Sequence, residues 1–344
     1  MTDKNLDETQ LRELIALITR NGQPNINPLA EITRNDLAIR WNLKVYGYLL
    51  ARLLLEKEPS HKSISVEESP FPGNWKATEL KDFDQSWFRT VCHELHIEPI
   101  LHRKVWELAY VVSTLHSFDL LRHGVKGLGF ACGEEPLPSL FASKGVEVVA
   151  TDLMPQAAAA SGWKDTAQHA SSLDLLWKPD LVSRNVFDKH VSLQFVDMND
   201  IPSSLHGQFD FCWSMCAFEH LGSIERGLSF VENSLKVLKP GGIAVHTTEF
   251  NFASDSDTID NWGTVLFRRS DFERLREHLA RQGFNVPPVS YETGDHPVDW
   301  FLDVPPFPGD PEYLTEKFPQ YPHLKLVVDG FPSTCFGLFV QKPL

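Results

Sequence analysis

The stretch VKGLGFACGEEPLPSLFASKGVEVVATD, from Val125 to Asp152, decides the fold. A short apolar run, Val125 to Phe130, leads into a turn that holds Gly129 and Gly133, and a helical segment follows. A second run rich in β-branched residues then stops at Asp152. The order strand, glycine turn, helix, strand predicts a βαβ unit with two parallel strands side by side.

The glycine pattern of this unit reads Gly129-x-Ala131-x-Gly133. Small residues here let the backbone turn sharply and approach a ligand, and an acid after the second strand can accept hydrogen bonds from ribose hydroxyls. Asp152 stands 23 positions after Gly129 and is the predicted ribose acceptor. Because the same pattern also occurs as a plain tight turn, the other segments have to decide between the two interpretations.

Composition excludes several classes of protein. The chain has 344 residues, of which 42% are hydrophobic and 23% charged, as in globular proteins. The net charge of −14 argues against nucleic acid as the main partner, because phosphate binding favours a basic surface. The five cysteines are scattered without a CxxC pair, so neither a disulfide framework nor a zinc ribbon is expected. The polar N-terminus and the absence of a long apolar run predict a cytoplasmic protein without a membrane span.

We expect two regions. Residues 1–124 are predicted to form a helical N-terminal extension or cap, and residues 125–344 an α/β domain with a long insertion at about 292–324. Within the first region, helices are expected around 11–18, 36–56 and 101–121, and the helical region is expected to cover the ligand side of the sheet.

Further strands and helices alternate after Asp152. A short helix is expected at 157–160, strands at 191–196, 209–215, 242–248, 286–291 and 334–341, and helices at 223–238 and 270–283. Ser270 is the expected cap of the last helix, and the LKPGG sequence is expected to end the helix before it. Such alternation predicts a parallel sheet with right-handed crossovers, whose ligands bind beyond the carboxyl ends of the strands. Glu249 is expected just past the end of its strand.

In this order and spacing the segments resemble the class I S-adenosylmethionine-dependent methyltransferases. The similar features are the glycine loop, Asp152, Asp197-Met198, EHLGS after the fourth strand, LKPGG before the fifth, and a closing strand that ends in GLFVQKP. The resemblance implies a Rossmann-like, seven-stranded, mostly parallel sheet with an antiparallel last strand, and S-adenosyl-L-methionine as cofactor. The EPLP loop, the HRKVWE helix and the HTTEFN segment are similar to a bacterial subgroup associated with saccharide or natural-product pathways.

The resemblance also implies roles for particular residues. Asp152 is expected to bind the ribose hydroxyls, Asp197 the adenine amino group, and Met198 to border the adenine ring. Gly129, Ala131 and Gly133 are expected to line the amino-acid portion of the cofactor. The full set of expected cofactor-binding residues is Gly129, Ala131, Gly133, Glu135, Asp152, Leu153, Asp197, Met198 and Cys216.

A hydroxyl acceptor would need a base in addition to in-line alignment. The candidate catalytic residues are His220, His246 and Glu249. His246 lies inside a strand, where it can equally be a hydrogen-bonded core residue. A metal-assisted variant would combine His246 and Glu249 with Asp295 or His296, but no compact ligand motif supports it, so no metal is expected.

The leading hypothesis is therefore O-methylation of a small-molecule or saccharide acceptor. Two alternatives stay open. An NAD-dependent oxidoreductase would share the glycine loop and Asp152 but would not explain Asp197-Met198. A non-catalytic, cofactor-binding regulatory protein would need the cofactor site without the base.

Overall fold

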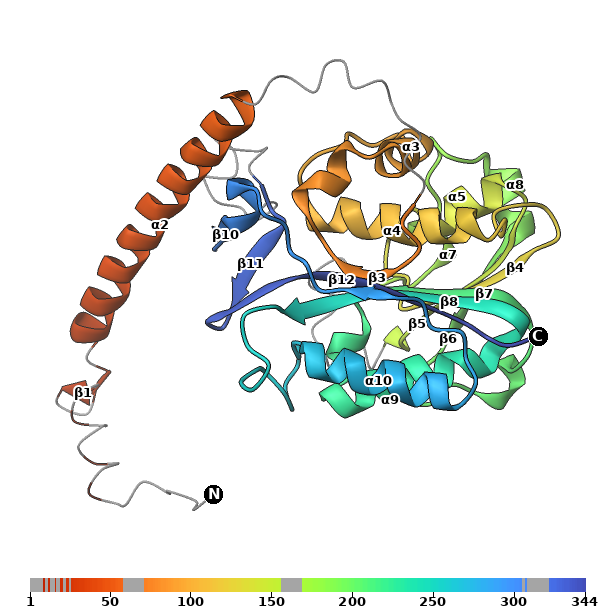
Figure 1. Ribbon diagram of the computed structural model, residues 1–344. Helices are drawn as coiled ribbons and strands as arrows, with labels where there is room; N and C mark the ends of the chain where they lie inside the picture. The colour runs from red at the N-terminus through yellow and green to blue at the C-terminus, as the bar shows by residue number, and fades with distance from the viewer. Residues whose placement is uncertain are drawn as a thin grey trace.

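A mixed sheet with helices on both faces forms the body of the molecule (Figure 1). The computed structural model describes residues 26–57, 71–155, 169–304, 307 and 322–344, together with residues 9, 12, 16, 19–20 and 23–24. The expected helices at 157–160 and, for the most part, at 11–18 lie outside the described residues.

Ten of the described strands share one sheet, in the order β10-β11-β12-β8-β7-β4-β5-β6, with β3 between β12 and β9. They are β3 (Trp75–Ala77), β4 (Lys126–Phe130), β5 (Glu147–Asp152), β6 (Val191–Phe195), β7 (Phe209–Met215), β8 (Leu238–Asn251), β9 (Val289–Ser290), β10 (Leu302–Asp303), β11 (Lys325–Val328) and β12 (Phe331–Gln341). A separate pair is formed by β1 (Thr19–Arg20) and β2 (Gln23–Pro24).

The sheet has the predicted direction pattern. Neighbouring strands from β6 through β5, β4 and β7 to β8 are parallel, and β12 runs antiparallel to β8. This confirms the Rossmann-like fold class with an antiparallel last strand. All five parallel strands consequently end at the same edge.

Two helical layers cover this sheet (Figure 1). One contains α3 (Ser86–Glu94), α4 (Arg103–Ser117) and α5 (Leu137–Ser143), and the other α9 (Ile224–Ser234) and α10 (Arg269–Arg281). The shorter helices are α7 (Leu173–Leu176), α8 (Arg184–His190) and the 3-10 turns η1 (Leu80–Asp84), η3 (Ser203–Leu205), η4 (Phe218–His220), η5 (Leu235–Val237) and η6 (Pro297–Trp300).

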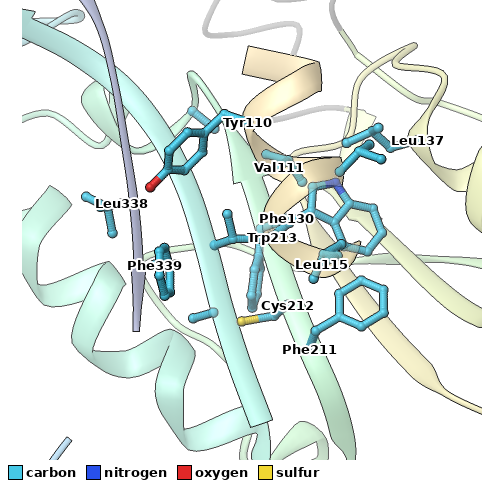
Figure 2. Close-up of a cluster of buried hydrophobic side chains, with 14 of the residues drawn as sticks. Tyr110, Val111, Leu115, Phe130, Leu137, Phe211, Cys212, Trp213, Leu338 and Phe339 are labelled. Atoms are coloured by element: carbon cyan, nitrogen blue, oxygen red, sulfur yellow. The ribbon is translucent and has the colours of Figure 1, made fainter. Parts of the chain in front are cut away.

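The core beneath α4 joins residues from distant parts of the chain (Figure 2). Tyr110 and Val111 of α4 lie over Trp213 of β7 and Leu338 of β12, and all four side chains are fully buried. Tyr110 also fills the space above Gly337, where an added Cβ would lie 2.5 Å from its ring. Burying these large rings is the main stabilising contribution of α4 to the sheet.

The described part of residues 1–124, which were expected to be mostly helical, also contains the strand β3. β3 pairs with both β12 and β9, and its Trp75 donates a hydrogen bond to the Phe339 carbonyl at 2.6 Å. Trp75 and Val112 belong to the same buried cluster as Leu128, so the hydrophobic core continues across the expected boundary at position 124. Three residues offer too little periodicity to reveal such a strand in the sequence.

Two expected element ends also differ. β8 begins at Leu238, ahead of the LKPGG glycines, because the helix before it already ends at Ser234 and continues only as η5. α10 begins one residue before Ser270, since the Asp271 carboxylate accepts from the N–H of the true cap, Arg268, at 2.9 Å. The expected strand at 286–291 is reduced to β9, and part of the expected insertion forms η6 and β10.

α2 (Ile26–Lys57) stands beside the body at the side of β10 and β11 (Figure 1). It extends the helix expected at 36–56 by one residue at its C-terminal end and by ten at its N-terminal end. Among the described residues, no helix is long and apolar enough to cross a bilayer.

Candidate active site

The carboxyl edge of the parallel strands has a topological switch point. From β4 the chain proceeds outward to β5 and β6, and it then returns to β7 on the other side of β4. In open α/β sheets the ligand crevice lies at such a reversal. The residues that follow β4, β5, β6, β7 and β8 therefore build one candidate site.

The glycine loop turns at Ala131 and not already at Gly129, as the sequence had indicated. Gly129 lies inside β4, and a Cβ there would come within 2.4 Å of the Trp213 ring, so packing explains this glycine. The turn itself is made by Ala131 (φ 49°) and Gly133 (φ 52°), both in the left-handed region. Expecting Gly129 in the turn was wrong, whereas Ala131 and Gly133 do shape the loop.

Asp152 ties this loop to the end of β5. Its carboxylate accepts hydrogen bonds from the backbone N–H groups of Gly133 at 3.0 Å, Ala170 at 2.9 Å and Leu153 at 2.7 Å. The Leu153 carbonyl accepts from His169 Nε2 at 2.7 Å, and that nitrogen lies 3.8 Å from Asp152. Asp152 is thus a buried, well-anchored acceptor at the crevice.

Asp197 stands on the neighbouring strand at the same edge. Phe195, the last residue of β6, is the register partner of Asp152, and the Val196 N–H donates to the Asp152 carbonyl at 2.8 Å. The Asp197 side chain is exposed and accepts from the Asn199 N–H at 2.8 Å.

A hollow of about 430 Å³ opens beside Asp197. Its lining comes from the loop after β6 and from one face of α9, and consists of Asp197, Met198, Asn199, Arg226, Ser229, Phe230 and Asn233. A hollow of this size lies in the range of small-molecule sites.

Glu135, the acid of the glycine loop, faces β7. Its carboxylate accepts from Trp213 Nε1 at 2.6 Å. Burial raises the pKa of Glu135 to about 8, and the hydrogen bond from Trp213 only partly opposes that rise. Glu135 therefore holds its proton up to neutral pH.

The other half of the edge carries a mostly buried cluster of charged groups and thiols, which we call the Arg103 cluster. It is formed by Arg103, Lys104, Glu107, Cys216, Glu219, Glu249 and Cys335, of which Lys104 is partly exposed. Arg103, at the start of α4, forms an ion pair with Glu249 of β8. The same guanidinium lies 3.4 Å from Cys335 Sγ and 3.6 Å from Cys216 Sγ. Glu107 accepts from Thr247 at 2.6 Å and from Cys335 at 2.8 Å, and lies 3.3 Å from Lys104 Nζ.

Glu249 lies inside β8, not past its end as expected. β7 stops at Met215, opposite Thr247, whereas β8 continues to Asn251 along β12. Glu249 therefore stands two residues beyond the level at which β7 ends, over the crevice. Burial alone would raise the pKa of Glu249, but the charges of Arg103 and Lys104 outweigh burial and lower it.

Glu219 is the acid of the cluster that forms no ion pair with Arg103 or Lys104. It accepts from Thr248 at 3.0 Å through one oxygen, while the other has no hydrogen-bond partner among the described residues. Burial raises the pKa of Glu219 above its ordinary value, and the nearby His220 pulls it down. His220 Nε2 lies 3.9 Å from that second oxygen.

His220 is oriented through its other nitrogen. Nδ1 lies 3.0 Å from the Gly263 carbonyl, which can only accept, and 3.1 Å from the Thr264 hydroxyl. With the proton on Nδ1, Nε2 carries the lone pair. The side chain is 23% exposed, so it reaches the surface of the crevice while remaining fixed.

His246 lies on the opposite face of the sheet from Glu249. Their separation of three residues along β8 puts them on different faces of a strand. His246 is fully buried, 2.8 Å from the Ser214 hydroxyl and 3.0 Å from the Ser234 hydroxyl, among Phe218 and Phe230. Burial lowers the pKa of His246 to about 3. The structure does not bring this candidate base to the crevice edge with Glu249.

Two groups of potential metal ligands share Cys216 in the described residues. One adds Glu107 and Cys335, and the other adds Glu219 and Glu249. The pairing of His246 with Glu249 that the sequence suggested is not among them, because the two point to opposite faces. Arg103 already supplies positive charge to Glu249 and to both thiols.

Sequence reasoning missed Arg103, Glu107, Glu219 and Cys335 as site residues. Arg103 and Glu107 lie in the HRKVWE segment, which contributed only to the resemblance. Their spacing of four residues puts both on one helix face, which was the available signal. Their partners Glu249 and Cys335 are more than a hundred residues away, so no local pattern could pair them.

Part of the chain matches a known protein family. Residues 128–246 match the family model described as "Methyltransferase domain". This segment runs from β4 into β8 and includes the glycine loop, Asp152, Asp197 and His220. None of the curated proteins matches the chain.

Several solved structures are similar at low identity. The (4+2)-cyclase SpnF is 17% identical, with 69% of this chain and 82% of that chain covered and a TM-score of 0.42. A putative sarcosine dimethylglycine methyltransferase from Galdieria sulphuraria is 13% identical, with 75% and 99% covered and a TM-score of 0.39. A SAM-dependent methyltransferase from Aquifex aeolicus is 14% identical, with 67% and 88% covered and a TM-score of 0.35.

The family match identifies the enzyme class. Residues 128–246 form a methyltransferase domain whose cofactor is S-adenosyl-L-methionine. The residues of the edge fit that cofactor, because a buried acceptor at Asp152 and a hollow beside Asp197 follow adjacent strands of the Rossmann-like sheet.

Proposed function

We propose that the chain transfers a methyl group from S-adenosyl-L-methionine to a hydroxyl of a small molecule or saccharide, with His220 as the general base. The observation that carries this proposal is the orientation of His220, whose Nδ1 faces the Gly263 carbonyl and whose Nε2 faces Glu219. In this tautomer Nε2 can accept the proton of a hydroxyl.

The cofactor would be held by the β4, β5 and β6 ends of the edge. Asp152 would accept from the ribose hydroxyls, Asp197 from the adenine amino group, and Met198 would border the base in the hollow. Ala131, Gly133, Glu135, Leu153 and Cys216 follow the ends of β4, β5 and β7 and would line the rest of the ligand. When bound, S-adenosyl-L-methionine supplies an electrophilic methyl group on its sulfonium.

Glu219 would support His220 in the proton transfer. A histidine that takes up a proton becomes a cation, and a carboxylate oxygen 3.9 Å away stabilises that cation. The same oxygen has no hydrogen-bond partner among the described residues, so it is available for this purpose. Glu249 is a weaker candidate for the base, because its ion pair with Arg103 lowers its basicity.

The acceptor would bind over β7 and β8, between His220 and the Arg103 cluster. Hydroxyl, carboxylate and guanidinium groups converge there, and such groups recognise polyhydroxylated ligands by hydrogen bonds. The similarity to the saccharide or natural-product subgroup agrees with that chemistry. The five free thiols agree with a reducing compartment such as the cytoplasm as the proposed location.

A methyl-transfer assay with a panel of glycosides and phenols tests the proposal. His220→Gln should lower kcat by about 10²- to 10⁴-fold while leaving the affinity for S-adenosylhomocysteine within about twofold. His206→Gln, which changes an exposed histidine directly after η3, is the matched control and should keep full activity. Full activity of His220→Gln on every accepted hydroxyl would remove His220 as the base, and transfer only to amines would overturn O-methylation.

A further inference from the structure

α2 has apolar residues on two faces, and within the part of the chain that the structure describes only one of these faces packs on the body. On the inner face Lys44, Tyr48 and Ala51 are buried. Lys44 Nζ lies 3.0 Å from Asp303 of β10 and donates to the Val304 carbonyl at 2.8 Å. Gly47 lies so close to Phe301 that an added Cβ would be 2.6 Å from its ring. This face therefore docks α2 on η6 and β10.

The outer face is a regular apolar seam formed by Ile39, Leu43, Tyr46, Leu50 and Leu53, which we call the α2 seam. The side chains of the α2 seam are 59%, 65%, 68%, 59% and 52% exposed, in that order. Their spacings are four, three, four and three residues, the alternation of the d and a positions in a heptad repeat. Asp36 takes the next position of the same spacing toward the N-terminus of the helix and is exposed as well.

A heptad seam is a surface that another helix covers. An ordinary surface helix has its polar side opposite the body, whereas α2 has large aliphatic side chains there. The 32-residue length of α2 is ample for several heptads. The seam thus has the length and the period of a coiled-coil interface.

We infer that the α2 seam binds the α2 seam of a second copy of this chain, forming a symmetric dimer. The five side chains expose on the order of 600 Å² per helix, so that a symmetric pair can bury up to about 1,200 Å² of them, which is the lower end of the range of specific interfaces. A two-fold symmetric pair covers the seams of both subunits at once, because each subunit contributes the same patch to the interface.

The two helices of the dimer run antiparallel. Asp36 occupies an a position of the heptad, and its carboxylate is half-exposed beside Arg40, with 2.8 Å between Oδ2 and Nε. A parallel pair would bring the two Asp36 carboxylates together, and an antiparallel pair separates them. Dimerisation would leave both crevice edges open, because the seam lies on the side of α2 that faces away from η6.

A bilayer surface is a less suitable occupant of the seam. Helices that lie on membranes carry Lys and Arg on the face opposite the apolar one. In α2 that opposite face is docked on the body through Lys44, and the chain has a net charge of −14.

Sedimentation equilibrium of the full chain tests the dimer. The wild type should have twice the 39.0 kDa mass of one chain, and Leu43→Glu should sediment as a single chain with at least a 100-fold weaker association. Ala38→Glu introduces the same charge at an exposed position of α2 outside the seam and should stay dimeric. Far-UV circular dichroism should show that all three proteins remain folded, and Leu43→Glu should retain S-adenosylhomocysteine binding.

The inference would be overturned by a wild type that is monomeric at all concentrations, or by a Leu43→Glu variant that associates as tightly as the wild type. Two further results would assign the seam to another occupant. A full chain that is monomeric and dimerises once residues 1–25 are deleted would assign the seam to the chain's own N-terminal segment. A monomeric chain that co-sediments with phosphatidylcholine–phosphatidylserine vesicles through the α2 seam would assign the seam to a membrane surface.

Discussion

The Asp152 carboxylate accepts a hydrogen bond from the backbone N–H of Gly133 at 3.0 Å, across nineteen residues of the βαβ unit. The acid at the end of β5 and the turn after β4 are therefore one structural unit. Removing the carboxylate would leave the N–H groups of Gly133 and Ala170 without their acceptor, at a cost of about 1–3 kcal/mol for each buried group. Binding and folding are coupled at Asp152, which makes Asp197 the cleaner test of cofactor recognition.

Asp197→Ala should weaken S-adenosylhomocysteine binding by about tenfold, because one charge-assisted hydrogen bond to the base is lost. The melting temperature should stay within about 1 °C, since Asp197 is exposed and its side chain accepts one described hydrogen bond, from the nearby Asn199 N–H. Isothermal titration calorimetry and thermal unfolding measure the two effects. Asp200→Ala, an exposed acid in the same loop, is the control. Equal affinities of the two variants would remove Asp197 from the cofactor site.

Arg103→Met should destabilise the protein by about 3–5 kcal/mol, because Glu249 and Glu107 would become buried acids without their guanidinium. Arg122→Met breaks an exposed ion pair with Asp119 at 3.0 Å and should cost less than about 1 kcal/mol. Urea unfolding monitored by tryptophan fluorescence compares the two. A loss of similar size in both variants would mean that the Arg103 cluster is not a buried ionic network.

His246→Phe should lower stability but leave kcat within about threefold of the wild type. The Ser214 and Ser234 hydroxyls lose their buried partner, which costs about 1–3 kcal/mol, while the crevice edge is unchanged. The methyl-transfer assay and urea unfolding measure the two effects on the same preparation. A fall in kcat comparable to that of His220→Gln would instead make His246 part of the proton pathway.

Glu135→Gln should raise stability at alkaline pH. The pKa of Glu135 is about 8 in the folded protein against an ordinary value of 4.5, so between these values the folded state binds more protons than the unfolded one. Wild-type stability must therefore fall as pH rises from about 5 to 8 through this group, while the neutral glutamine carries no such dependence.

The measurement for this prediction is the melting temperature from pH 5 to pH 9. The curves of wild type and Glu135→Gln should lie close together near pH 5, where both side chains are neutral, and the variant should melt higher at pH 9. Parallel curves over the whole range would contradict a raised pKa at Glu135.

The sequence predicted the strands and helix ends that depend on nearby residues. The runs at 125–130, 191–196 and 209–215 became β4, β6 and β7 with bounds changed by at most one residue. Apolar runs are typical of buried parallel strands, which explains β4 and β7, whereas β6 is a largely exposed strand at the end of the strand order. Gly283, with a φ of 87°, follows the end of α10 within two residues, as a helix-stopping glycine should.

The parts that failed depend on distant partners. β3 forms because it pairs with β12 on one side and with β9 on the other, and no sequence pattern near Trp75 predicts that pairing. The Arg103–Glu249 ion pair joins positions 146 apart. The orientation of His246 could have been predicted from the sequence, because a separation of three residues from Glu249 along one strand puts the two side chains on opposite faces.

Isothermal titration of the wild type with S-adenosylhomocysteine and, separately, with NAD tests most directly that the edge from Asp152 to Asp197 holds an S-adenosyl cofactor. One S-adenosylhomocysteine should bind per chain with micromolar or tighter affinity, Asp197→Ala should weaken that binding by about tenfold, and NAD should give no heat. Binding of NAD without binding of S-adenosylhomocysteine, or an Asp197→Ala variant with unchanged affinity, would contradict the assignment of this edge to an S-adenosyl cofactor.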